Sequence, residues 1–223
     1  MALYAKHCKM LKTMDESDVL KILQDVGAFR AGHFVFTSGL HADTYINKDA
    51  IYPHVAQVSK LCRAMAEKFK NDNVEVVIGP AVGAVILSTW TAHHMSEMLG
   101  REVYGVYADK NGDEGFVIRR GYDKLIAGKR ALIVEDLTTT GGSIRKVVGA
   151  ARIAGAEVVG AIAIANRGNV TKEAVGDPAR FESLVDLELE QWQGSECVLC
   201  ERGIPVNADV GHGRDFLKSK GML

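Results

Sequence analysis

Hydrophobic residues recur at helical spacing in two segments near the start of the chain. In residues 15–26 they fall on one face, Asp15 is expected to cap the first turn, and Gly27 ends the helix. Residues 54–69 repeat this spacing. Between the two helices, residues 29–48 alternate aromatic and small side chains around a Ser-Gly pair, which predicts two short strands joined by a turn.

The rest of the chain alternates short apolar runs with helical segments. Strands are expected at residues 74–78, 103–107, 131–134, 158–165 and 183–189, and helices at residues 81–98 and 141–154. This alternation predicts an α/β fold with a parallel central sheet that helices cover on both faces. Ligands of such sheets bind beyond the carboxyl ends of the strands. Functional residues are therefore expected near residues 79–80, 107–110, 135–140 and 166–167.

Composition and charge exclude several classes of protein. The chain has 223 residues, of which 47% are hydrophobic and 25% charged, as in a globular α/β domain and unlike a disordered chain. A net charge of −1 gives no field that would attract nucleic acid or an anionic membrane. The start of the chain lacks the apolar core of a signal peptide, and the four cysteines suggest no disulfide framework. We therefore expect a cytoplasmic protein with neither nucleic acid nor membrane as a partner.

The most informative segment is residues 131–143, an apolar run followed by two acids and then by a turn rich in hydroxyls and glycine. The glycines let successive backbone N–H groups face one anion, and the helix that follows adds its positive dipole end. Two adjacent carboxylates can accept hydrogen bonds from vicinal hydroxyls. A ribose that carries a 5-phosphate offers both features. The candidate binding residues are Glu135, Asp136, Thr138, Thr139, Thr140, Gly141, Gly142 and Ser143.

Other interpretations of residues 131–143 explain the sequence less well. An ordinary capped strand-turn-helix junction explains either half of it, but not an acidic pair and a phosphate turn in one contiguous run. The segment lacks the Gly-Lys-Ser/Thr ending of a Walker P-loop and the Gly-x-Gly-x-x-Gly of a dinucleotide-binding domain.

The segment resembles the signature of type I phosphoribosyltransferases that binds 5-phosphoribosyl-1-pyrophosphate (PRPP), except that Thr138 stands where an aliphatic residue is usual. Outside it, the chain is similar to orotate phosphoribosyltransferase at residues 36–39, 45–47, 79–81 and 165–168. The resemblance covers roughly residues 18–190. It implies a phosphoribosyltransferase domain at residues 1–193, with a small hood built from the N-terminal region. Residues 194–223 are then a C-terminal appendage.

The resemblance also implies an activity. The family transfers the phosphoribosyl group of PRPP, which carries Mg²⁺, to orotate and releases pyrophosphate and orotidine 5-phosphate on the route to UMP. It implies a homodimer, and catalytic roles for Asp136 and, by its place in the loop, Lys110. Arg167, Tyr45 and Thr139 are the candidates for contacting the base, because an arginine fork suits the orotate carboxylate.

Several cations of the family pattern are missing from this chain. Thr37 replaces a lysine, residues 82–84 contain none, and residues 107–114 offer only Lys110, whose other interpretation is a solvated loop lysine. Two alternatives therefore stay open. One is a purine phosphoribosyltransferase, and the other is a PRPP-binding regulator without catalysis.

The C-terminal appendage contains a Cys-x-x-Cys pair. Cys197 and Cys200, with His212 and Asp209 as further candidate ligands, are candidates for a Zn²⁺ site. The spacing from cysteine to histidine is shorter than in zinc fingers. A reduced pair without metal is therefore the preferred interpretation.

Overall fold

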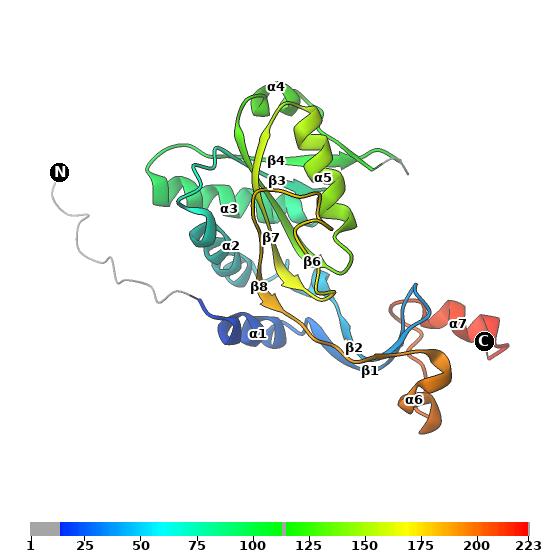
Figure 1. Cartoon of the computed structure of the whole chain (residues 1–223). Helices are drawn as coiled ribbons and strands as arrows, with labels where there is room; N and C mark the ends of the chain where they lie inside the picture. The colour runs from blue at the N-terminus through cyan, green and yellow to red at the C-terminus, as the bar shows by residue number, and fades with distance from the viewer. Residues whose placement is uncertain (1–13, 113–114, 223) are drawn as a thin grey trace.

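The computed structural model describes residues 14–112 and 115–222, which form a six-stranded sheet, its flanking helices and a smaller three-stranded sheet (Figure 1). The large sheet has the order β5-β4-β3-β6-β7-β8, and only β5 is antiparallel to its neighbour. Its strands are β3 (Val76–Pro80), β4 (Tyr104–Lys110), β5 (Phe116–Val117), β6 (Arg130–Thr138), β7 (Glu157–Asn166) and β8 (Phe181–Asp186). The predicted parallel α/β sheet is confirmed.

Helices cover both faces of this sheet because its strands are apolar on both sides. Val77 and Leu132 belong to the core on one face, whereas Val76 and Ile133 belong to the core on the other. The first face carries α1 (Glu16–Asp25), α2 (Val55–Phe69) and α3 (Ala84–Leu99), and the second carries α4 (Tyr122–Ile126) and α5 (Gly142–Ile153). Among the described residues, no helix is both long and apolar enough to cross a membrane.

The smaller sheet joins the two ends of the chain. It consists of β1 (Phe29–Val35), β2 (His41–Ile46) and β9 (Gln191–Trp192) in the order β1-β2-β9. The segment after β9 contains α6 (Val198–Glu201) and α7 (Gly213–Ser219) and folds back against the β1–β2 hairpin (Figure 1). Two short 3-10 helices, Lys48–Ala50 and Gly194–Glu196, follow β2 and β9.

Most predicted elements are found within a few residues of their expected bounds. Asp15 caps α1 through a capping box, as predicted. Two expectations about strand ends were wrong. The strand that carries Glu135 and Asp136 runs on through both acids to Thr138, because β7 pairs with it to that point. The strand expected at residues 103–107 runs on to Lys110, because Lys110 pairs with Phe116 of β5.

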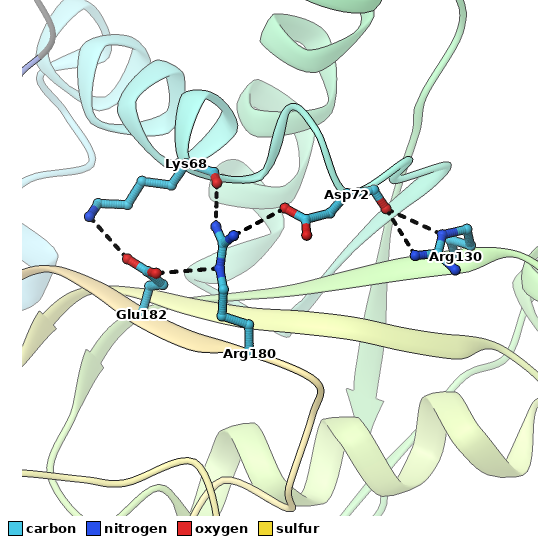
Figure 2. A network of polar contacts seen from close by, with 5 residues as sticks. All are labelled: Lys68, Asp72, Arg130, Arg180 and Glu182. Carbon is cyan, nitrogen blue, oxygen red and sulfur yellow. Dashed lines mark hydrogen bonds and ion pairs between the residues drawn. The ribbon is translucent and has the colours of Figure 1, made fainter.

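A cluster of polar contacts joins the end of α2 to the start of β8 (Figure 2). Arg180 donates to the backbone carbonyl of Lys68, and its guanidinium lies 4.0 Å from the centre of the Phe69 ring. The same guanidinium lies 3.4 Å from a carboxylate oxygen of Asp72 and 3.3 Å from one of Glu182. Arg180 therefore satisfies a carbonyl at the C-terminus of α2 and covers an aromatic ring.

Replacing Arg180 with methionine should lower the free energy of unfolding by about 1–2 kcal/mol, because a carbonyl hydrogen bond and a cation–π contact are lost. Urea unfolding at equilibrium measures this change. Lys172→Met is the matched control, since it removes only an exposed ion pair to Asp177 and should cost less than about 0.5 kcal/mol. Equal losses in the two variants would contradict the special role of Arg180.

Candidate functional site

The acidic pair lies at the carboxyl end of β6 and is almost fully buried. Glu135 is 6% exposed and Asp136 is 2% exposed. Lys48 Nζ lies 3.2 and 3.1 Å from the two carboxylate oxygens of Asp136. Tyr52 donates a hydrogen bond of 2.5 Å to the same carboxylate. The segment after β2 therefore covers Asp136 with one cation and one hydroxyl, whereas Glu135 forms no ion pair within the described part of the chain.

The protonation of these groups follows from their burial. Burial, and then the negative charge of Asp136, raises the pKa of Glu135 to about 8. Burial and the same charge raise the pKa of Tyr52 far above its usual range, so its hydroxyl remains a donor. Burial opposes the charge on Lys48, but Asp136 outweighs this effect and raises the pKa of Lys48. At neutral pH the Glu135 carboxyl is therefore largely protonated, while Lys48 lies against the carboxylate of Asp136.

The raised pKa of Glu135 predicts a dependence of stability on pH in the ligand-free protein. The folded state binds this proton more tightly than the unfolded state, so stability should fall as pH rises from 4.5 to about 8. In Glu135→Gln this contribution is absent. We expect the melting temperature of the parent, relative to that of Glu135→Gln, to decrease over this window. A difference that stays constant or increases would contradict the assigned pKa.

The turn after β6 forms a small hollow at the N-terminus of α5. The hollow has a volume of about 150 Å³ and is lined by Glu135 and by residues 137–144. Gly141 adopts a φ of 76°, and a Cβ atom there would lie 2.9 Å from the carbonyl oxygen of Ala174. Only glycine fits this position without strain. The turn thus presents exposed hydroxyls and backbone N–H groups around a space suited to a phosphate.

The hydroxyl-bearing residues of this turn differ in their exposure to solvent. Thr139, Thr140 and Ser143 are exposed, whereas Thr138 is buried. The Thr138 hydroxyl accepts a hydrogen bond of 3.1 Å from the N–H of Gly141. Thr138, where the family resemblance has an aliphatic residue, therefore holds the turn closed, and its hydroxyl is already engaged within the protein.

A second polar hollow, with a volume of about 170 Å³, lies on the other side of Glu135. It is lined by Lys48, Lys110, Phe116, Glu135, Ser143 and residues 80–84. Gly83 allows a close approach here, because a Cβ atom would lie 2.6 Å from the Tyr52 hydroxyl oxygen. Lys48 and Lys110 bring two cations to this hollow. This arrangement suits a polyanion such as pyrophosphate.

A larger cavity of about 610 Å³ lies between the β1–β2 hairpin and the phosphate turn. Arg167 lines it, at the end of β7, with its guanidinium 4.1 Å from the centre of the Phe36 ring. Arg167 Nε is buried and has no hydrogen-bond partner among the residues that the structure describes, and burial lowers the pKa of the guanidinium. Tyr45 and Thr139 line the same cavity, so all three predicted base-contacting residues lie together. A planar group with a carboxylate would satisfy Arg167 and fit against Phe36.

The predicted metal ligands separate in space. Cys197 and Cys200 lie together, but their neighbours are His33 and His41. His212 lies instead at the larger cavity lined by Arg167, which we call the base-side cavity. Its Nδ1 is 3.6 Å from a carboxylate oxygen of Asp215. The candidate ligand His212 is therefore not beside the cysteine pair, and the histidines that are beside it are His33 and His41.

Sequence reasoning missed Lys48 and Tyr52 at the acidic pair and His33 and His41 beside the cysteines. Lys48 directly follows the Tyr-Ile-Asn run that carries part of the family resemblance, so its place in the chain was a usable signal. Tyr52 and the two histidines had no local signal. Each of these residues contacts a partner that is 84 or more residues away in the chain.

Comparison with known proteins agrees with this geometry. Residues 47–196 match the phosphoribosyl transferase domain family. The orotate phosphoribosyltransferase of Caldanaerobacter subterraneus subsp. tengcongensis is 37% identical over 195 residues, which cover 86% of this chain and 96% of that relative. The orotate phosphoribosyltransferase of Thermus thermophilus is 35% identical over 189 residues, with 85% and 98% covered. The solved structure of Mycobacterium tuberculosis H37Rv orotate phosphoribosyltransferase has a TM-score of 0.62 and 25% identity, covering 78% of this chain and 97% of that one.

Proposed function

The chain belongs to the orotate phosphoribosyltransferase family, and from this membership we propose that it transfers the phosphoribosyl group of PRPP to orotate. The products are orotidine 5-phosphate and pyrophosphate, on the route to UMP. The observation that carries the proposal is the buried Glu135–Asp136 pair directly beside the phosphate-sized hollow of residues 137–144. These two features match the hydroxyls and the 5-phosphate of one ribose.

Each part of PRPP has a proposed set of partners. The 5-phosphate binds the exposed hydroxyls of Thr139, Thr140 and Ser143 and the N–H groups at the start of α5. The carboxyl groups of Glu135 and Asp136 accept hydrogen bonds from the ribose hydroxyls. This requires Lys48 to give up one of its two contacts with the Asp136 carboxylate. Mg²⁺ enters with the pyrophosphate, as part of the substrate.

The base occupies the larger cavity in this proposal. Arg167 donates to the orotate carboxylate, and Phe36 holds the guanidinium in place by stacking. The buried and unpartnered Nε of Arg167 supports an anionic partner, since such a donor is otherwise costly. A neutral purine has no carboxylate to offer, so the same observation favours orotate.

Catalysis comes from position and charge. A nitrogen of the base attacks C1 of the ribose as the bond to pyrophosphate breaks, through an oxocarbenium-like transition state. Negative charge develops on the departing pyrophosphate, where Lys48 and Lys110 can stabilise it. Lys48 thus supplies a cation near the pyrophosphate, where this chain lacks several of the cations that are usual in the family. Asp136 holds the ribose hydroxyls and so orients C1 toward the base.

The proposal is tested by measuring pyrophosphate release from PRPP and Mg²⁺ with orotate and with a panel of purines. Release with orotate alone is the expected result. Release only with a purine would assign the base differently. Binding of PRPP without release for any base would instead indicate a regulator.

We also propose that the enzyme acts in the cytoplasm as a homodimer. The three cysteines in the described part of the chain are free, as a reducing compartment allows. The dimer follows from the family resemblance. Sedimentation equilibrium with and without PRPP tests it, and a monomer at working concentrations would contradict it.

A further inference from the structure

Four side chains with metal-binding atoms meet where the C-terminal segment crosses the β1–β2 hairpin. His33 is in β1, His41 begins β2, Cys197 precedes α6 and Cys200 lies within it. Their ligand atoms all lie within 4.8 Å of one another. Three of the four residues are buried, and only Cys200 reaches the surface.

The separations fit tetrahedral coordination. Cys197 Sγ lies 3.6 Å from His33 Nε2, and Cys200 Sγ lies 3.8 Å from His33 Nε2 and 3.5 Å from His41 Nδ1. Zinc with Zn–N near 2.0–2.1 Å and Zn–S near 2.3 Å separates nitrogen from sulfur by about 3.5 Å. The two nitrogens are 2.8 Å apart, about 0.5 Å closer than the tetrahedral edge. A small movement of one ring would therefore complete the geometry.

The hydrogen bonding of His33 prepares it to bind a cation. Its Nδ1 lies 2.7 Å from the carbonyl oxygen of Ile204, which can only accept, so Nδ1 carries the proton. Nε2 then presents its lone pair toward the two sulfurs. A carbonyl that fixes the tautomer and ring orientation in this way is the usual outer partner of a metal-binding histidine.

We propose that His33, His41, Cys197 and Cys200 bind a structural Zn²⁺ ion that fastens the C-terminal segment to the β1–β2 hairpin. Two thiolates and two imidazoles form a closed tetrahedral set, which favours zinc and leaves no position for a substrate. The competing arrangements are a His33–His41 hydrogen bond beside two thiols, and a disulfide between the cysteines. Neither of these arrangements explains why all four ligand atoms lie so close to one another.

The proposed zinc site lies next to the base-side cavity. Asn207 donates a backbone hydrogen bond of 2.7 Å to the carbonyl of His33, and His212 donates one of 2.9 Å to that of Val35. The next residue in the chain, Phe36, stacks on Arg167. The metal therefore holds the strand and the C-terminal segment that together form one wall of this cavity.

Metal analysis tests the site without reference to activity. Protein purified under reducing conditions and without chelators should contain about one zinc ion per chain, and Cys197→Ser and Cys200→Ser should each lose it. Cys62→Ala and His93→Ala are matched controls that should retain it, since Cys62 lies in the core around α2 and His93 lies on α3. Retention in both cysteine variants, or a Cys197–Cys200 disulfide in the parent, would overturn the proposal.

A second measurement on the unmodified chain covers the case in which the variants fail to fold. Zinc is removed with a chelator under reducing conditions and replaced with Co²⁺, whose absorption spectrum reports tetrahedral coordination and thiolate ligands. Such a spectrum, lost on adding zinc, supports the site. A spectrum of octahedral cobalt without thiolate bands, or no uptake of either metal, would refute it.

The effect on the base-side cavity rests on the proposed function and is measured separately. Removal of zinc should raise KM for orotate by about tenfold or more while changing the Kd for PRPP less than about threefold. Loss of zinc from the cysteine variants with no change in orotate KM would overturn the link to this cavity and leave the metal site intact. An inactive parent that still contains zinc would refute the proposed function alone.

Discussion

Replacing Glu135 with glutamine and Asp136 with asparagine together should weaken PRPP binding by up to about 30- to 2,000-fold, with a matching loss in kcat/KM. A hydrogen bond to a charged acceptor such as Asp136 contributes about 1.5–3 kcal/mol, and one to the largely protonated Glu135 about 0.5–1.5 kcal/mol, so replacing both acceptors costs up to about 2–4.5 kcal/mol. The amides also remove the charge that holds Lys48, so the cation no longer has a fixed position. Titration calorimetry with PRPP and Mg²⁺ in the absence of base measures the binding directly.

The control for this variant must separate lost binding from lost folding. Glu16→Gln with Asp25→Asn changes the same number of charges on α1, away from the site, and should leave PRPP affinity within about twofold of the parent, as surface changes usually do. The far-ultraviolet circular dichroism spectrum of the site variant should match that of the parent, which shows that the variant folds. Unchanged PRPP affinity in the site variant would disprove the assigned role of the acidic pair.

Replacing Arg167 with methionine should raise KM for orotate about 30- to 150-fold and leave PRPP binding nearly unchanged. Removing one partner of a buried charged pair costs about 2–5 kcal/mol, and Arg167 is only half buried, so the lower part of this range is expected. Methionine keeps much of the contact with Phe36, so the cavity wall should persist. Initial-rate kinetics with each substrate varied in turn measure the two effects separately.

Lysine at the same position gives the matched comparison. Arg167→Lys keeps the positive charge but loses the planar fork and part of the stacking, so its KM for orotate should lie between those of the parent and the methionine variant. Equal weakening of PRPP and orotate in Arg167→Met would contradict a role in recognising the base. Improved use of a purine by that variant would indicate that the arginine selects against neutral bases.

The strand-turn-helix of residues 131–153 could be predicted because all its signals are local. An apolar run, two acids and a glycine-rich turn are contiguous, so backbone preferences and side-chain chemistry agree within one short segment. The end of the strand was misjudged because pairing with β7 extends it to Thr138, and no local pattern reports the length of a neighbouring strand. The short elements after residue 190 were also missed, since contacts with the hairpin stabilise them more than their own propensities do.

The order of residues along the chain thus determined the parallel sheet, the phosphate turn and the placing of Arg167 at a strand end, because these depend on periodicity and on neighbours in sequence. Only the tertiary structure decided which cation faces Asp136 and which histidines meet the two cysteines. Lys48 is 88 residues from Asp136, and His33 is 164 residues from Cys197. Contacts over such separations are selected by the packing of whole elements, which the linear pattern of one segment does not contain.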